Sequence, residues 1–377
     1  MFAMFGLFGG NKGERIALFD VSSSSVRAAY ALVVPGAPLR IIFETKVGIE
    51  AGPTTVGDAP MLRAMDAALR ELREKGAPLL RKATGSGSAS RAYASVCAPW
   101  QKTNLRTESR VEDKPFTVTE GFIREALGKE QPAKGHVLTE EAVVATLLNG
   151  YETHAPVGKK ASHAEVIVLS ASMGEETYSL MRRALASFSA SREVRFSSFA
   201  SVAFRALHQA FPHEGDYLAL RVSGEATELA AVKRGFPLST GAIGIGVNAF
   251  SRAARESGIS SAVGADQGVI DREKSEKLDQ GLKDAEAAWT AEITSTLQGF
   301  AAAHALPRTV FLLTDEEALG FFSRLLNSPD LHRLWLSDEP LSVIPLDSKH
   351  FASLVVRDAP FSENAPIDLL ALHASAI

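Results

Sequence analysis

A short segment near the N-terminus has the residue types and spacing expected of a phosphate-binding turn. The apolar pair Leu18-Phe19 leads into Asp20, and four serines follow before the next apolar segment: Ser22, Ser23, Ser24 and Ser25. A tight turn of small residues lets backbone N–H groups point at an anion, and serine hydroxyls add further donors. The Asp20 carboxylate would lie where a hydrated metal ion needs a ligand. The pattern predicts a hairpin that holds phosphate and metal, although an ordinary surface turn can have the same composition.

The composition bounds the class of protein. At 377 residues the chain is too long for one ordinary core and suits two domains or a bilobed protein with an insertion. Hydrophobic residues make up 46% and charged residues 22%, an ordinary soluble composition without an apolar run long enough to span a membrane. The net charge of −4, with no basic stripe, argues against a nucleic-acid partner. The single cysteine, Cys97, excludes an internal disulfide and fits a reducing cytoplasm.

The first ten residues differ from the rest of the chain. They contain three phenylalanines and no charged side chain, and they lack the basic region and cleavage site of a signal peptide. One interpretation is a short hook that inserts at a membrane surface or into the groove of a partner. The other is a disordered tail whose apolar residues have no function. Both remain open on the sequence alone.

Hydrophobic patterns along the rest of the chain alternate between strand-like and helix-like segments. Strands are predicted at 15–32 (two strands around the serine turn), 39–49, 92–98, 143–151, 164–170, 216–222, 227–233 and 307–314. Helices are predicted at 61–75, 117–127, 175–188, 198–211, 247–255 and 271–303, and the Gly/Ser segment 84–90 is typical of a flexible linker. This alternation indicates a mixed α/β architecture in which each half opens with strand, turn and strand.

Several motifs in the middle and at the end of the chain occur in a familiar order. They are Asn149-Gly150-Tyr151, the segment 156–161, Glu165-Val166, the helix starts at 117–120 and 199–203, and the closing segment 367–374. In this order they resemble the bacterial actin-like family that contains the cell-division protein FtsA, with the pilus-assembly protein PilM as a close relative. The resemblance runs from about residue 15 to the end and is poorest in the second half.

This resemblance implies an α/β, bilobed actin-like (ribonuclease H-like) ATPase fold with a small inserted α+β subdomain of the SHS2 type. The implied divisions are an apolar tail (1–14), the first lobe in three parts (15–90, 163–213 and 346–377), the inserted subdomain (91–162) and the second lobe (214–345). In the family, two β-hairpins grip the phosphates of ATP. The residues of a residual nucleotide cleft would then be Asp20, Ser22, Ser23, Ser24, Ser25 and Gly224, with no catalytic residue and no protein metal site.

The second hairpin departs from the family pattern. Where the family has roughly Asp-Ile-Gly-Gly-Gly-Thr, this chain has an arginine at position 221 and a glutamate at position 225. A carboxylate about 4 Å from a phosphate charge costs roughly 4 kcal/mol at an effective dielectric constant of about 20, and Glu225 also removes the close approach that glycine permits. The adenosine turn, roughly Thr-Gly-Gly-Gly-Ala in the family, is here the acidic segment 314–318. We therefore expect no cofactor, or weak binding of ATP and Mg²⁺, and weak or lost ATPase activity.

Three alternatives bear on this expectation. Arg221 could pair with a phosphate directly and make the cleft an atypical anion site. The acids at 315–317 could simply open the next helix, where negative charge suits the helix dipole. The glycine-rich segment 241–246 lacks a Walker lysine and is typical of a loop before a helix.

The resemblance implies a cytoplasmic scaffold in cell division that links a filament, by resemblance that of the tubulin-like FtsZ, to the inner face of the membrane. Other divisome proteins and self-association are further expected contacts. The alternatives are a PilM-like component of a type IV pilus or secretion platform, and an active actin-like ATPase. FtsA proteins usually continue into an amphipathic helix, whereas this sequence stops at Ile377, so residues 1–10 are the candidate segment if the chain contacts a membrane.

Overall fold

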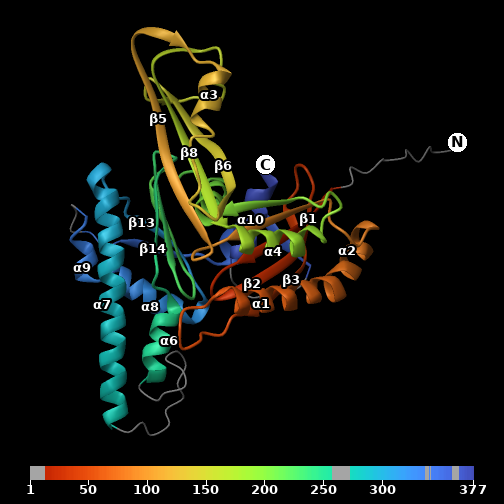
Figure 1. Ribbon diagram of the computed structural model, residues 1–377, viewed down its shortest axis with the longest axis vertical. Coiled ribbons are helices and arrows are strands. Elements are labelled where there is room, and N and C mark those ends of the chain that lie inside the picture. The colour runs from red at the N-terminus through yellow and green to blue at the C-terminus, as the bar shows by residue number, and fades with distance from the viewer. Residues whose placement is uncertain (1–12, 257–271, 336–338, 340, 359–364) are drawn as a thin grey trace, which may run out of the picture.

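The computed structural model describes residues 13–256, 272–335, 339, 341–358 and 365–377, and it has three β-sheets (Figure 1). Six strands in the order β15-β3-β2-β1-β4-β9 form the sheet of the first lobe. Their bounds are β1 Glu14–Val21, β2 Ser25–Val33, β3 Leu39–Gly48, β4 Arg91–Val96, β9 Val194–Ser198 and β15 Val355–Arg357. Each of β1 and β2 has buried side chains on both faces, because helices cover the sheet on either side.

The second lobe has a five-stranded sheet in the order β12-β11-β10-β13-β14. The strands are β10 Tyr217–Val222, β11 Thr227–Lys233, β12 Phe236–Ile243, β13 Thr309–Leu313 and β14 Ser342–Pro345. The helices of this lobe are α6 Val247–Glu256, α7 Arg272–Ala303, α8 Glu316–Leu326 and α9 Pro329–His332. Within its core the buried indole of Trp289 donates a hydrogen bond to Thr227 Oγ1 over 3.0 Å, which ties α7 to β11.

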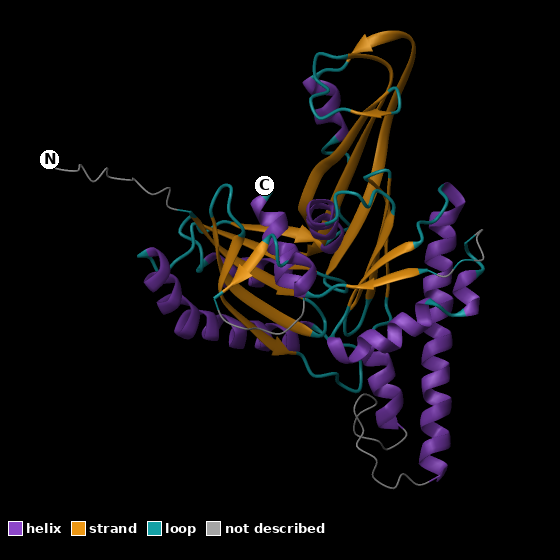
Figure 2. Cartoon of the chain, turned by 180° about the vertical axis from the view of Figure 1, so that it is seen from behind, coloured by secondary structure: helices purple, strands orange, loops and turns teal. Residues whose placement is uncertain are grey.

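A third sheet, in the order β5-β8-β6-β7, projects beyond the two lobes (Figures 1 and 2). Its elements are β5 Gln101–Thr117, α3 Glu120–Ala126, β6 His136–Leu148, β7 Tyr151–Glu152 and β8 Lys160–Gly174. The inserted unit therefore runs from 101 to 174 and differs from the predicted 91–162. The segment 91–96 is β4 of the first lobe, and β8 continues through the expected boundary as one strand that pairs with both β5 and β6.

The remaining helices cover the first lobe. They are α1 Asp58–Glu71, the π-helical turn η1 Leu72–Gly76, α2 Ala77–Thr84, α4 Glu175–Ala186, α5 Phe199–Ala210, the 3₁₀ turn η2 Ser348–Phe351 and α10 Pro366–Ser375. One apolar cluster joins the lobes: α5 and α10 pack against each other, α10 packs against β1 of the first lobe, and α5 packs against β10 and β11 of the second. Inside it, the buried His373 ring shares a hydrogen bond of 2.9 Å with Ser197 Oγ.

Candidate functional site

The serine turn closes on itself. Asp20 pairs with Arg27 across the β1–β2 hairpin. The Ser22 N–H donates to the Ser25 carbonyl over 3.0 Å, the Ser22 hydroxyl donates to the same carbonyl over 3.1 Å, and it accepts the Ser25 N–H over 3.2 Å. Some of the N–H and hydroxyl groups that were expected to bind an anion therefore hydrogen-bond within the turn instead.

The β10–β11 hairpin of the second lobe repeats this construction. The Ser223 N–H and hydroxyl both donate to the Ala226 carbonyl, over 2.9 and 3.0 Å. Asp20 and Arg221 stand at equivalent places, each two residues before the first serine of its turn. The two hairpins thus face each other with an acid on one and a base on the other.

The two turns touch. Ser23 Oγ shares a hydrogen bond of 2.9 Å with Ser223 Oγ and accepts the Glu225 N–H over 2.7 Å. A Cβ on Gly224 would lie 2.5 Å from the Ser23 carbonyl oxygen. Glycine is therefore required at position 224 by the close approach of the first lobe's backbone.

We expect Gly224→Ala to lower the free energy of unfolding by about 1–3 kcal/mol, because the new methyl group would meet backbone that has no room to move. The added Cβ would lie 2.5 Å from the Ser23 carbonyl oxygen and 2.8 Å from Asn248 Nδ2. Gly244→Ala is the matched control, since no atom lies within 4 Å of its added Cβ. Urea denaturation of both variants measures the effect, and equal losses would contradict it.

Asp20 and Arg221 form a buried, two-pronged ion pair. The Arg221 Nη1 and Nη2 atoms lie 2.8 and 2.7 Å from the two oxygens of Asp20. The exposed fractions of Asp20 and Arg221 are only 1% and 6%. Burial acts to lower the pKa of Arg221, but the Asp20 carboxylate outweighs it and the pKa is raised, so the guanidinium stays charged. Arg221 therefore neutralises the carboxylate that was expected to face a metal ion.

A second set of charges lies beside this pair. Asp315 of the second lobe accepts a hydrogen bond of 2.6 Å from Lys46 Nζ of the first lobe and lies 3.7 Å from the buried Arg27. Burial acts to raise the pKa of Asp315, but Lys46 and Arg27 more than offset it and hold that pKa below its usual range. Arg27 also lies 4.0 Å from the buried Glu44, whose pKa burial raises to about 7.

Glu225 turns away from the Asp20 side of the cleft. Its carboxylate accepts hydrogen bonds from Asn248 Nδ2 at 2.7 Å and from both terminal nitrogens of Arg252 at 3.0 Å, and both partners lie on α6. Burial acts to raise the pKa of Glu225, but the hydrogen bonds from Arg252 and Asn248 more than offset it. The pKa of Glu225 is therefore below its usual value. The glutamate that was expected to repel phosphate is bound to the second lobe's own helix.

The acids of the adenosine turn open a helix. Asp315 is the N-cap of α8, and Glu316 and Glu317 occupy its first turn. Negative charge at this end is favourable because the helix dipole is positive there. Of the two interpretations offered by the sequence, the geometry favours the helix start, with the added ion pair from Asp315 to Lys46.

The space left between the hairpins does not fit a nucleoside triphosphate with its metal ion. The cavity has a volume of about 20 Å³, about what one water molecule needs. Its walls include Ser22, Ser24, Ser25, Arg27, Arg221 and Asp315, whereas Ser23 and Gly224 are taken up by the contact between the turns. Small-molecule pockets typically measure about 300–1,000 Å³. The expected site residues thus come together in space, but they bind one another.

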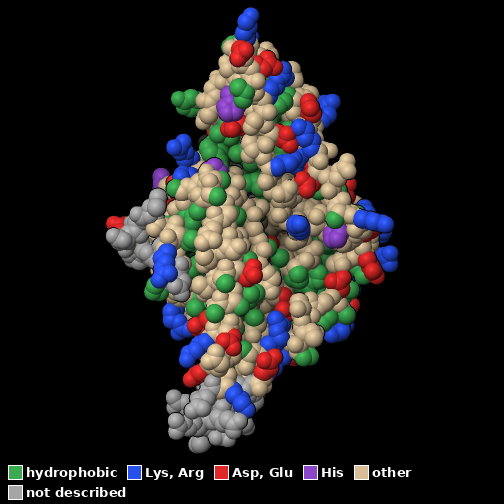
Figure 3. Space-filling model, turned by 60° about the vertical axis from the view of Figure 1, so that its left-hand side comes forward, with side chains coloured by type: hydrophobic (Ala, Val, Ile, Leu, Met, Phe, Trp, Pro, Cys, Tyr) green, Lys and Arg blue, Asp and Glu red, His purple; other side chains and the backbone are tan. Residues whose placement is uncertain are grey.

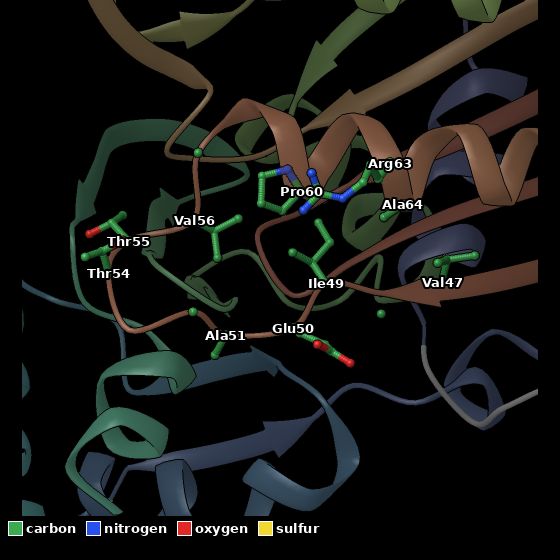
Figure 4. Close-up of a pocket in the computed structure, with 13 residues that line it drawn as sticks. Val47, Ile49, Glu50, Ala51, Thr54, Thr55, Val56, Pro60, Arg63 and Ala64 are labelled. Atoms are coloured by element: carbon green, nitrogen blue, oxygen red, sulfur yellow. The ribbon is translucent and has the colours of Figure 1, made fainter. Parts of the chain in front are cut away.

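A larger hollow of about 610 Å³ lies between the loop 47–57 and the start of α1 (Figure 4). Its lining includes the buried side chains of Ile49 and Val56 and the exposed side chains of Glu50 and Arg63. A specific small-molecule site needs polar groups that converge on one point, and the polar groups of this hollow do not converge. Across the residues with described side chains, no group of three His, Cys, Asp or Glu is placed to hold a metal ion. No helix in the described parts of the chain is both long and apolar enough to cross a bilayer.

Sequence reasoning missed the partners of the cleft charges. Arg27, Glu44 and Lys46 were treated as ordinary strand residues, and Arg252 as part of a helix. A usable signal was present, because Arg27 and Glu44 interrupt strands whose other residues are mainly apolar. A charged side chain inside a buried strand needs a charged partner, so these residues predict buried ion pairs. The sequence alone does not identify the partner of each charge.

Comparisons with known proteins identify the fold of this chain. No family model and no curated protein matches the sequence. A chain in a solved structure of the PilM–PilN type IV pilus biogenesis complex matches with a TM-score of 0.57 at 14% sequence identity, over 95% of this chain and 96% of that chain. A protein of actin-like ATPase fold and unknown function from Bacteroides thetaiotaomicron matches with a TM-score of 0.41 at 10% identity, over 90% of this chain and 94% of the other.

A further match is the ethanolamine utilization protein EutJ from Carboxydothermus hydrogenoformans, with a TM-score of 0.41 at 10% identity, covering 95% of this chain and 88% of the other. At these identities a likeness shows the fold alone. The bilobed, mixed α/β architecture of the actin-like fold that the sequence predicted is thus confirmed.

Proposed function

We propose that this chain is a PilM-like scaffold protein, an actin-fold protein that binds protein partners and does not hydrolyse ATP. The observation that carries the proposal is the contact between the two hairpin turns, with the Asp20–Arg221 pair behind it. Residues that would otherwise accept phosphate and metal instead neutralise one another. Because the cleft is closed, we infer that the function of this protein lies in binding partners at its surface.

The comparison supports the protein-binding half of the proposal. One solved structure that resembles this chain over nearly its full length is a complex of PilM with another pilus biogenesis protein, PilN. Over the face drawn in Figure 3, basic and acidic side chains are interspersed and are not gathered by sign. That distribution suits a protein partner better than a polyanion.

An FtsA-like role in cell division remains a second candidate. The motif that favoured it, Asn149-Gly150-Tyr151, has a structural explanation: Asn149 and Gly150 have φ values of 51° and 83° in the turn between β6 and β7. The Asn149 side-chain oxygen also accepts the N–H groups of Ser162 and His163, each over 3.0 Å. An Asn-Gly pair is what such a turn requires, so the motif does not separate the two roles. The membrane hook at 1–10 lies outside the described residues.

We expect calorimetric titration of ATP with Mg²⁺ into the purified protein to give no heat of binding up to millimolar nucleotide. An Asp20→Ala variant serves as control. Micromolar binding by the wild type that is lost in this variant would show that the cleft opens to nucleotide, and would contradict the closed cleft on which the proposal rests. The partner half is tested by a two-hybrid assay of this chain against the PilN and FtsZ proteins of its own source. Interaction with PilN alone supports the PilM-like role, and interaction with FtsZ alone overturns it.

A further inference from the structure

Two interfaces of different character join the lobes. One is an apolar seam formed by α5 and α10, in which Phe199, Val202 and Ala206 pack with residues of both sheets. The other is a polar contact between the tips of the two hairpins. The two interfaces adjoin, because the Arg221 guanidinium lies 5.9 Å from the centre of the Phe199 ring.

The polar side has three sets of contacts between residues far apart in the sequence. Asp20 pairs with Arg221, Lys46 pairs with Asp315, and the Ser23 hydroxyl binds both Ser223 and the Glu225 N–H. The guanidinium of Arg255 on α6 also donates to the Ala51 carbonyl in the loop after β3. Each contact has one member in the first lobe and the other in the second.

We propose that the Asp20–Arg221 and Lys46–Asp315 pairs form a latch that holds the lobes closed without any bound ligand. The inference rests on the proposed function, since it assumes that no nucleotide occupies the cleft. The latch gives the molecule one fixed angle between its lobes, so a partner that contacts both lobes, or the inserted sheet above them, meets a preformed surface.

The inner pair carries most of the closure. Both of its side chains are buried, so bulk salt screens it weakly. Opening the cleft would separate two buried charges that hydrogen-bond to each other. The outer pair is partly exposed, with 34% of the Lys46 side chain and 22% of the Asp315 side chain accessible. Its removal should loosen the latch without opening it fully.

Hydrogen exchange tests the latch, because the Glu225 N–H donates across the lobe boundary to Ser23 Oγ. We expect Arg221→Gln to speed exchange of this amide at least tenfold, while the amide of Leu207, about two helical turns beyond Phe199 on α5, exchanges as in the wild type. Arg40→Gln is the matched control, since Arg40 forms an exposed ion pair with Asp358 inside the first lobe. Unchanged exchange at Glu225 in a folded Arg221→Gln protein would overturn the proposal.

If Arg221→Gln does not fold, the Lys46→Met variant tests the latch in its place. A severalfold faster exchange at Glu225 supports the latch, and exchange equal to that of the Arg40→Gln control overturns it. Adding 1 mM ATP with Mg²⁺ to the wild type separates the two proposals. Slower exchange at Glu225 with nucleotide would show that nucleotide binds, and would contradict the closed cleft on which the proposed function rests. The result with Arg221→Gln tests the latch itself.

Discussion

Removing either member of the Asp20–Arg221 pair is expected to lower the free energy of unfolding by about 3–5 kcal/mol, because each single change leaves a buried charge without its partner. Asp20→Asn leaves the guanidinium of Arg221 uncompensated, and Arg221→Met leaves the Asp20 carboxylate. Both side chains are almost fully buried, so neither charge can reach water without opening the cleft. Equilibrium denaturation in guanidinium chloride measures each loss.

The double variant Asp20→Asn/Arg221→Met should lose less than the sum of the single changes by at least about 2 kcal/mol, since it buries no net charge. Arg40→Met supplies the surface comparison. Arg40 is 47% exposed in its pair with Asp358, and such pairs contribute about 0–1 kcal/mol. Additive losses in the cycle, or a loss for Arg40→Met as large as that for Arg221→Met, would contradict a buried, coupled pair.

The position of this pair along each strand could be predicted from the sequence. Apolar segments ending at Asp20 and at Val222, each followed by small polar residues, predict two hairpins, and the second was expected at 216–222 and 227–233 against the observed Tyr217–Val222 and Thr227–Lys233. Alternation of strand and helix patterns likewise predicted the mixed α/β architecture. These features depend on local hydrophobic pattern and turn chemistry, which a single sequence contains.

The pairing itself could not be predicted. Asp20 and Arg221 are separated by 201 positions, and their contact depends on how the two lobes meet. The direction of the Glu225 side chain depends on where α6 begins, because Arg252 and Asn248 of that helix bind it. The boundary of the inserted sheet was misplaced for a similar reason, since a motif ends near residue 162 while the hydrogen-bonded strand β8 continues to Gly174.

Two further buried carboxylates make stability fall as the pH rises. Burial raises the pKa of Glu44 from 4.5 to about 7, although Arg27 and Arg357 lower it in part. Burial likewise raises the pKa of Glu228 to about 7, against the effect of Arg221. The folded state then binds more protons than the unfolded state between pH 4.5 and 7, so each group's contribution is complete below pH 4.5 and lost as the pH passes 7. A shift of this size corresponds to about 3 kcal/mol for each group.

His373 acts in the opposite direction. Burial, with Arg205, lowers its pKa from 6.5 to about 4, so its contribution is complete above pH 6.5 and is lost as the pH falls through 4. The pH range in which His373 changes stability overlaps that of Glu44 and Glu228. The pH dependence of wild-type stability therefore contains both the carboxylate and the histidine contributions. Differences between variants separate them, since each variant removes one titrating group and leaves the others in place.

We therefore expect Glu228→Gln to match the wild type near pH 4.5 and to be more stable by about 3 kcal/mol at pH 8, because the amide resembles the protonated carboxyl at every pH. Glu44→Gln should behave in the same way. Glu120→Gln is the surface control, because the Glu120 side chain is 75% exposed on α3. Denaturation at pH 4.5, 6 and 8 measures the differences. A Glu228→Gln protein that loses stability at pH 8 would mean that the Glu228 carboxylate is needed there as a charged partner of Arg221.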